Sequence, residues 1–226
     1  MKPKEIRLNT PLTNLALNDY DHVGSAAETP LREDAFDLTD EEKISLIATH
    51  FKSIMETLGL DLTDDSLKGT PERVARMYVS EVFSGLNPVN KPSVTLFENK
   101  FKYTEMIVEK DITFYSHCEH HFVPIYGKAH VAYISTGKVI GLSKINRIVQ
   151  YYAKRPQVQE RLTMQIGNDL QSALGTEDVG VVLDANHLCV SSRGVADVNS
   201  KTGTAFFGGK FNNEITKSEF LNYINN

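Results

Sequence analysis

Apolar residues recurring at intervals of three and four predict a helix that begins near residue 39. Thr39 is expected to cap its first turn, and Glu42 three residues later completes a capping box. Gly59 is expected to end the helix, because glycine readily adopts the left-handed conformation that follows many helices. The stripe predicted to face inward consists of Ile44, Ile47, Phe51, Ile54, Met55 and Leu58.

A second helix is predicted to begin with Thr70 as its cap and Pro71 at its first helical position. Gly85 and Pro88 are expected to stop it. The two helices define a helical section over residues 39–90. Residues 1–38 are mixed and acidic, and we expect them to form a loosely ordered arm.

From residue 91 onward, runs rich in β-branched and aromatic residues predict a sheet. Strands are expected over residues 93–97, 105–115, 123–135, 179–192 and 204–211. Two helices interrupt them, one capped by residues 141–143 and one running from 157 to 174. A last short helix begins with the capping box of Thr216 and Glu219. Long strands joined through a turn favour an antiparallel sheet, so the pattern predicts an α+β fold in which residues 91–226 form one domain.

Composition excludes several classes of protein. Hydrophobic residues make up 41% of the chain and charged residues 23%, as in ordinary globular proteins. The net charge of −5 argues against general nucleic-acid binding, although a local basic patch can still hold a small anion. No apolar run approaches the ~20 residues of a membrane helix. The N-terminus lacks an apolar signal core, so we expect a cytoplasmic enzyme.

The two cysteines lie beside most of the histidines. Four of the seven histidines are at positions 117, 120, 121 and 187, next to Cys118 and Cys189. Two thiolates and an imidazole suit zinc, so Cys118, His121 and Cys189 form a candidate metal site. Three protein ligands leave a fourth position for water or substrate, which is typical of catalytic zinc.

The spacing of these residues predicts their geometry. Cys118 and His121 can hold one ion only if the strand before Cys118 ends and the chain turns there. His120 would then lie beside the metal but point away from it. In a continuing strand, His187, Cys189, Ser191 and Arg193 would share one face, which would bring His187 and Arg193 to the metal pocket.

Two other interpretations of the cysteines remain open. They can be small buried apolar residues without chemistry. They can also form a Cys118–Cys189 disulfide, although nothing marks the chain as secreted.

Candidate anion-binding residues lie where the helix after Gly141 begins. Lys144 and Arg147 share one face near that N-terminus, which is a plausible phosphate site, although a solvated charged face is the commoner outcome. Glu160 lies in the first turn of the following helix. Its carboxylate can be there because the helix dipole favours a negative charge, or it can accept hydrogen bonds from the edge of a nucleotide base. Neither of the common glycine-rich phosphate loops occurs.

Four ordered motifs closely resemble GTP cyclohydrolase I. They are Ser116-x-Cys-Glu-His-His-x-x-Pro124, Gly141-Leu-Ser-Lys-Ile-Asn-Arg147, Arg155-Pro-Gln-Val-Gln-Glu-Arg-Leu-Thr163 and His187-Leu-Cys-Val-x-x-Arg-Gly194. The resemblance covers roughly residues 40–226. It implies the tunnelling fold, an antiparallel sheet backed by two helices, and a homodecamer with active sites between subunits.

The resemblance also implies a reaction. GTP would be the substrate: its imidazole ring is opened, C8 leaves as formate, and the product recloses as 7,8-dihydroneopterin triphosphate for folate or tetrahydrobiopterin synthesis. Zinc held by Cys118, His121 and Cys189 would lower the pKa of a bound water toward ~7. The sequence identifies no regulatory protein partner.

The remaining roles follow from the resemblance together with the residue chemistry. His187 is the first candidate for protonating the purine at N7, and His120 is the second acid–base candidate. The triphosphate would be bound by Ser143, Lys144, Arg147 and Arg193, with Arg73 a weaker candidate. Gln159 and Glu160 would hold the guanine edge.

Two alternative functions are compatible with parts of this pattern. The first is another pterin or purine enzyme of the tunnelling fold. The second is a non-enzymatic, zinc-stabilised binding module, which would need a fourth protein ligand such as His117 or His120.

Overall fold

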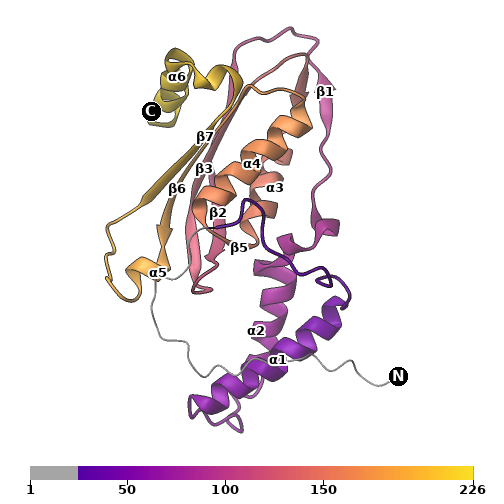
Figure 1. Ribbon diagram of the computed structural model, residues 1–226, viewed down its shortest axis with the longest axis vertical. Helices are drawn as coiled ribbons and strands as arrows, with labels where there is room; N and C mark the ends of the chain where they lie inside the picture. Colours follow the sequence, from indigo (N-terminus) through magenta and orange to yellow (C-terminus); the bar gives the residue numbers. More distant parts are fainter. Residues whose placement is uncertain (1–24, 226) are drawn as a thin grey trace.

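The structure is a computed structural model that describes residues 25–225 (Figure 1). Residues 1–24 of the predicted arm lie outside the described residues. Residues 25–38 contain turns and bends but no helix or strand. No helix formed by residues 25–225 is long and apolar enough to cross a membrane.

Two helices precede the sheet. Helix α1 (Asp40–Thr57) begins at the predicted capping box, in which Thr39 and Glu42 exchange hydrogen bonds. Gly59 follows it with φ of 83°. Of the predicted inward stripe, Ile44 and Met55 are buried, whereas Ile54 and Leu58 are exposed.

The second helix differs from its prediction in two respects. Helix α2 (Thr70–Arg76) is capped by Gly69, so Thr70 lies inside the helix and does not cap it. It continues as a π-helical segment, η1 (Met77–Val82), and two 3₁₀ turns, η2 (Ser84–Leu86) and η3 (Pro88–Asn90), lead to the sheet.

The main sheet has five strands in the order β5-β2-β3-β6-β7. They are β2 (Met106–Cys118), β3 (Pro124–Ile134), β5 (Pro156–Gln157), β6 (Val179–His187) and β7 (Thr202–Phe207). All pairs are antiparallel except β2 with β5, so the sheet is mixed. Strands β1 (Leu96–Glu98) and β4 (Lys138–Ile140) form a separate antiparallel pair.

Two helices, α3 (Leu142–Ala153) and α4 (Gln159–Leu174), cover one face of the sheet (Figure 1). The predicted α+β arrangement is therefore confirmed. Helix α4 begins two residues later than predicted, because Pro156 and Gln157 pair with the end of β2 as strand β5. Gly175 ends it in the left-handed conformation, as expected.

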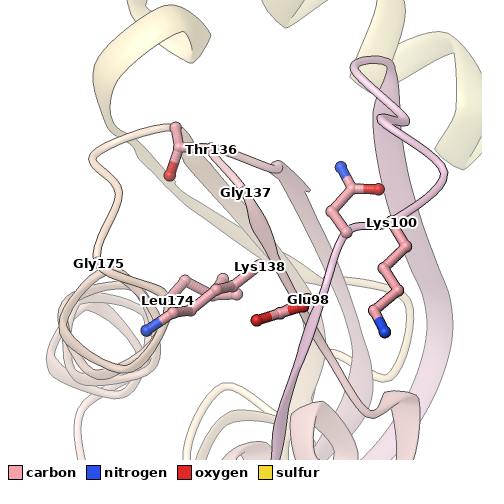
Figure 2. A pocket seen from close by; sticks show the side chains of 8 residues that line it. Glu98, Lys100, Thr136, Gly137, Lys138, Leu174 and Gly175 are labelled. Carbon is pink, nitrogen blue, oxygen red and sulfur yellow. The ribbon is translucent and has the colours of Figure 1, made fainter.

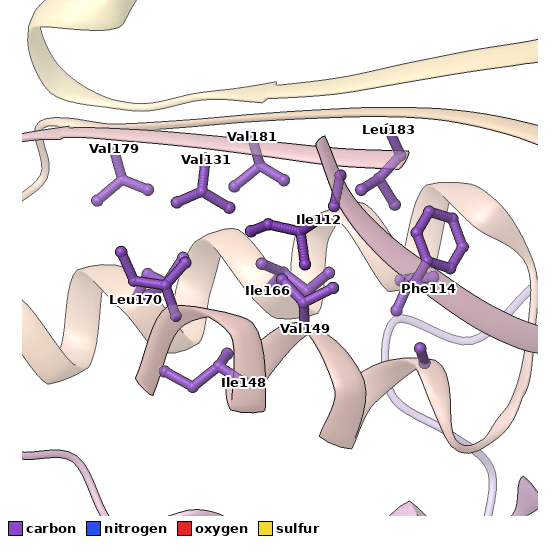
Figure 3. Close-up of a cluster of buried hydrophobic side chains, with 14 of the residues drawn as sticks. Ile112, Phe114, Val131, Ile148, Val149, Ile166, Leu170, Val179, Val181 and Leu183 are labelled. Atoms are coloured by element: carbon purple, nitrogen blue, oxygen red, sulfur yellow. The ribbon is translucent and has the colours of Figure 1, made fainter. Parts of the chain in front are cut away.

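The core lies between the sheet and these helices (Figure 3). Val131, Val181 and Leu183 point from the strands toward Ile148 on α3 and Ile166 on α4, and all five are almost fully buried. Side chains alternate across a strand, so one face of each strand supplies this layer. The packed layer fixes the ends of β2 and β6, from which the candidate metal ligands follow.

Three predicted boundaries are wrong. The strand predicted over 179–192 ends at His187, and residues 188–191 form a helical turn, α5 (Leu188–Ser191). The hydroxyls of Ser191 and Ser192 close this turn by donating to the carbonyl oxygens four residues earlier. The strand predicted over 204–211 is β7, which stops at Phe207 and is followed by a 3₁₀ turn, η4 (Gly209–Asn212).

The third difference concerns the caps of helices. Helix α6 (Glu214–Asn225) begins before Thr216, and the side chain of Asn213 accepts a hydrogen bond from the N–H of Ile215 in its place. Gly141 is the cap residue of α3 with no side-chain cap bond, so Ser143 lies within the first turn.

Candidate active site

The β2–β3 hairpin presents Cys118 and His121 side by side. Strand β2 ends at Cys118, and residues 119–121 turn, as predicted. The N–H of Phe122 donates to the carbonyl of Cys118 at 2.8 Å, and the N–H of Cys118 donates to Val123 at 2.9 Å. Phe122 has φ of 54°, a left-handed conformation that non-glycine residues rarely adopt. This tight turn brings Cys118 Sγ to 3.7 Å from His121 Nδ1.

Cys189 reaches the same point from α5. Strand β6 pairs with β3 so that His187 lies opposite Ile125, and the helical turn that follows carries Cys189 toward the hairpin. The ligand atoms of Cys118, His121 and Cys189 all lie within 4.8 Å of one another. The prediction that Cys189 lies on a strand face with His187, Ser191 and Arg193 is wrong. Cys189 nevertheless meets Cys118 and His121, the two residues predicted to bind the metal with it.

These three residues fit a zinc ion. Tetrahedral zinc with Zn–S of about 2.3 Å and Zn–N of about 2.05 Å separates a sulfur from a nitrogen ligand by about 3.6 Å. The Cys118–His121 separation of 3.7 Å matches this value. Both cysteines are free thiols, so the disulfide alternative does not apply here. Among residues 25–225 the group contains three residues, one fewer than a tetrahedral ion has ligand positions.

The thiols also need a cation electrostatically. Burial raises the pKa of the Cys189 thiol, and the neighbouring Cys118 raises it further. Two adjacent thiolates are therefore unfavourable by themselves, whereas a bound divalent cation stabilises both. The donor set is consistent with zinc on chemical grounds as well as geometric ones.

His120 lies closer to this cluster than predicted. Its Nδ1 is 3.7 Å from Cys118 Sγ, so the ring does not point away from the metal ligands. The carboxylate of Glu119 lies 3.8 Å from the other ring nitrogen of His120. The ring of His117, the other candidate for a fourth ligand, packs edge-on against Phe83 at 5.4 Å. Neither histidine belongs to the three-residue group.

His187 is held by a buried glutamine. Its Nε2 lies 2.7 Å from Oε1 of Gln159, which is 2% exposed. The amide nitrogen of Gln159 donates to the carbonyl oxygens of Leu183 and Thr202 and to the hydroxyl of Thr204. This network assigns the amide orientation, and so Nε2 of His187 must carry a proton. Burial lowers the pKa of His187, while the charge of Glu160 acts in the opposite direction.

This contact adds to the expectation for Gln159. The resemblance implies that Gln159 holds the guanine edge, and that stays a prediction. Here both ends of its amide bind protein groups, and the bond to Nε2 gives the side chain a second role, orienting His187.

An ion pair between the buried Arg161 and the half-buried Glu119, which the sequence analysis missed, lies behind the hairpin. The Arg161 side chain is 2% exposed, and its Nη1 and Nη2 donate to Glu119 at 2.5 and 3.3 Å. Its Nε donates to the carbonyl of Ala26 at 2.7 Å. The sequence position of Arg161 could have indicated its burial. Arg161 and Gln165 are four residues apart on α4, each next to an apolar core residue, Leu162 or Ile166, and both polar side chains are buried.

The predicted phosphate-binding residues of α3 lie far from the cluster within one chain. Helix α3 runs alongside β2, with Asn146 bonded to Glu109 and Gln150 bonded to Thr113. Nine residues of strand separate Glu109 from Cys118, which corresponds to about 30 Å. Ser143 and Lys144 precede Asn146 on α3, and Arg147 lies between the contacts that Asn146 and Gln150 make with Glu109 and Thr113.

Two cavities lie away from the metal ligands. One of about 540 Å³, drawn in Figure 2, is lined by residues such as Glu98, Lys138 and Leu174 at the opposite end of the sheet. Another, of about 350 Å³, lies between α3 and the 3₁₀ turns and is lined in part by Arg147 and Lys154. Neither contains a ligand of the candidate metal site.

Comparison with known proteins identifies the family. The family model described as GTP cyclohydrolase I matches residues 47–225. The chain belongs to the GTP cyclohydrolase I family. It is 66% identical over 203 residues to GTP cyclohydrolase 1 of Flavobacterium johnsoniae, covering 90% of this chain and 91% of that protein. It is 55% identical over 203 residues to GTP cyclohydrolase 1 of Salmonella arizonae, covering 89% and 91%.

A solved structure described as archaeosine synthase QueF-Like in the apo form is a more distant neighbour. It has a TM-score of 0.41 and 17% identity, and covers 48% of this chain and 97% of that one.

The other expected substrate residues lie in three places. Arg193 lies at the cluster, with Nη1 2.9 Å from His121 Nε2. Glu160 is exposed in the first turn of α4, between the buried Gln159 and Arg161. Arg73 lies on α2 and donates to Ser66 and Thr70, which ties it to the loop before that helix.

Proposed function

We propose that this chain catalyses the hydrolytic opening of the GTP imidazole ring, the release of formate and reclosure to 7,8-dihydroneopterin triphosphate. This is the first step toward folate or tetrahydrobiopterin. The observation that carries the proposal is the three-residue Cys118–His121–Cys189 cluster, reached by the segment that also carries His187. Family membership supports the same substrate.

Zinc at this cluster would supply Lewis-acid chemistry and a bound water of lowered pKa. His187 would donate a proton to the N7 side of the purine as C8 is attacked. Because Gln159 Oε1 accepts from Nε2–H, His187 would act as the acid in its imidazolium form, giving the proton of Nδ1 to the substrate and keeping the one on Nε2. His120, beside Cys118, would serve in a later proton transfer.

Recognition of guanine would fall to Glu160. Its carboxylate can accept hydrogen bonds from the N1–H and the 2-amino group together. Adenine lacks this pair of donors, and its binding would leave the carboxylate unsatisfied, so discrimination follows from hydrogen bonding.

The triphosphate would be bound by two subunits. Arg193 belongs to the chain that supplies the cluster, whereas Ser143, Lys144 and Arg147 all precede Gln150 on α3, whose partner Thr113 is already five strand residues, or about 17 Å, from Cys118. A neighbouring copy that brings its α3 N-terminus to this cluster would complete the site. We therefore propose a homo-oligomer, with the decamer implied by the family resemblance as its form. Arg73 would at most contact the outer phosphate.

The direct test is turnover of GTP by zinc-loaded protein. Pterin fluorescence and formate release should appear together in equal amounts. Absence of both would refute the function and favour another purine or pterin chemistry. A zinc-stabilised binding module would bind zinc through four protein ligands and turn over nothing.

The shared site has its own test. Cys189→Ser should abolish activity by removing a metal ligand, and Arg147→Ala should weaken GTP binding from the other side. Mixed oligomers assembled from both variants should regain activity, because some sites then combine an intact cluster with an intact α3. If mixing restores no activity, each chain must bind GTP alone.

Two wider assignments complete the proposal. Thiolate ligands must stay reduced, which suits the cytoplasm. We also retain the division into an arm (1–38), a helical section (39–90) and a catalytic domain (91–226).

A further inference from the structure

The first turn of α4 contacts both segments that supply the candidate metal ligands. Gln159 binds His187, two residues before Cys189. Arg161 binds Glu119, between Cys118 and His121. One helical turn thus reaches the end of β6 and the tip of the β2–β3 hairpin.

The bonds around Arg161 close into a ring. From Arg161, one arm runs through the carboxylate of Glu119, whose N–H donates to the carbonyl of Gln157 at 3.0 Å. The amide of Gln157 donates to Gln165 at 2.9 Å, and Gln165 donates to Glu28 at 2.9 Å. The other arm is the bond from Arg161 Nε to the carbonyl of Ala26, two residues from Glu28.

This ring restrains Glu119 from two directions. Its carboxylate is fixed by the two parallel N–H groups of a guanidinium, a geometry that sets direction as well as distance. Its backbone N–H is fixed by β5. A residue held in this way inside a three-residue turn also restricts Cys118 and His121 on either side. The bond from Nε to the carbonyl of Ala26 fixes the third side of the guanidinium, and the Arg161 side chain is 2% exposed.

We propose that Arg161 is a positioning residue for the metal-binding hairpin, acting through Glu119 and closed by the Ala26–Glu28 segment. Neither residue touches the reacting atoms in this role. Partners outside the ligand shell commonly change metal affinity or activity by about 10–100-fold when removed. The inference rests on the proposed function only for its effect on turnover.

The experiment compares Glu119→Gln, Arg161→Met and the double variant in the full-length zinc-loaded protein. Zinc release to a chromogenic chelator is measured without GTP, and turnover is expressed per bound zinc. We expect each single variant to release zinc about 10–100-fold faster and to lose about 10–100-fold in kcat, with KM for GTP changed less than about threefold. The zinc-release rate and kcat of the double variant should be no worse than those of the more affected single variant, because both substitutions break the same Arg161–Glu119 interaction.

Asp169→Asn is the matched control. Asp169 lies on α4, the helix that also carries Arg161, but about two turns further along it. Its side chain is 10% exposed, and its Oδ1 lies 2.5 Å from Nζ of Lys91. This variant should lower Tm but leave zinc release and kcat within about twofold of the parent. If Arg161→Met does not fold, Arg161→Lys retains the charge but cannot make all three bonds, and it should still accelerate zinc release.

One result would overturn the proposal and make the pair purely structural. In that result, Glu119→Gln and the Arg161 variant have a lower Tm, but their zinc release and turnover per zinc stay within twofold of the parent. Parent protein that holds zinc but does not convert GTP would refute the proposed function instead, while the zinc-release comparison would still decide the role of Arg161.

Discussion

Replacing Gln159 by leucine should separate the orientation of His187 from the metal site. The side chain is 2% exposed, so leucine fills a similar volume but cannot form hydrogen bonds. Its amide now contacts His187 at 2.7 Å, Thr202 at 2.8 Å, Thr204 at 3.1 Å and Leu183 at 3.3 Å.

The stability cost can be worked from these bonds. Thr204 keeps a partner, because its hydroxyl lies 2.6 Å from that of Thr163. The bonds to His187, Thr202 and Leu183 are lost at about 0.5–1.5 kcal/mol each, which gives a total of about 3 kcal/mol. For a chain of this size, that corresponds to a Tm lower by roughly 6–12 °C.

The effect on catalysis should be larger than the effect on stability. Without Gln159, the ring of His187 can turn and carry its proton on either nitrogen, so the general acid loses its alignment. Proton transfer by a positioned group contributes about 10²–10⁴-fold, and we expect kcat to fall by about 100-fold or more. Zinc content should not change, because none of the three ligands is altered.

The assay measures kcat, KM, zinc content and the imidazole ¹⁵N spectrum together. The spectrum should show Nε2–H for His187 in the parent and a mixture of tautomers in Gln159→Leu. Gln171→Leu is the control: it makes the same change on α4 about 18 Å away, where the amide donates only to Glu177, and its kcat should be normal. A kcat within about threefold of the parent in zinc-loaded Gln159→Leu would refute the reasoning.

Three further predictions concern the metal, the sheet and pH. Cys189→Ser should lose zinc, whereas His187→Ala should keep it and lose turnover; metal analysis decides, and zinc loss from His187→Ala would make that residue a ligand. Gly127→Ala should destabilise the fold by about 3 kcal/mol in urea titration, because its Cβ would lie 2.1 Å from the backbone oxygen of Asp184; a value near zero would show that β3 and β6 can separate freely. Burial lowers the pKa of His130, so the unfolded chain binds the extra proton first and the stability of the fold decreases as pH drops through the usual histidine pKa. His130→Gln should therefore reduce the loss of Tm between about pH 7 and 5. An unchanged dependence of Tm on pH would assign that loss to other groups.

The metal ligands were predictable from residue chemistry alone. Cysteine and histidine side chains suit zinc, and the alternation of a strand requires a turn after Cys118 before His121 can reach the same ion. The path that brings Cys189 there was not predictable in the same way. Residues 179–192 have the β-branched composition of a strand, and composition does not reveal that Ser191 and Ser192 bond back to the chain and close a helical turn.

Contacts between distant segments account for the other misses. The Arg161–Glu119 pair joins residues 42 positions apart, and the Arg161–Ala26 bond joins residues 135 apart. Periodicity identifies the helix that carries Arg161 but not what faces it. The hydrogen bonds of Gln159 were not predictable for the same reason, because its partners come from β6 and from the start of β7.

The most direct test of the three-ligand site is zinc X-ray absorption on the loaded protein. The cluster predicts two sulfur neighbours at about 2.3 Å, one imidazole nitrogen at about 2.0–2.1 Å and one light atom from a non-protein ligand. Two imidazoles in the zinc shell, or a shell without both sulfurs, would contradict an open catalytic position held by Cys118, His121 and Cys189.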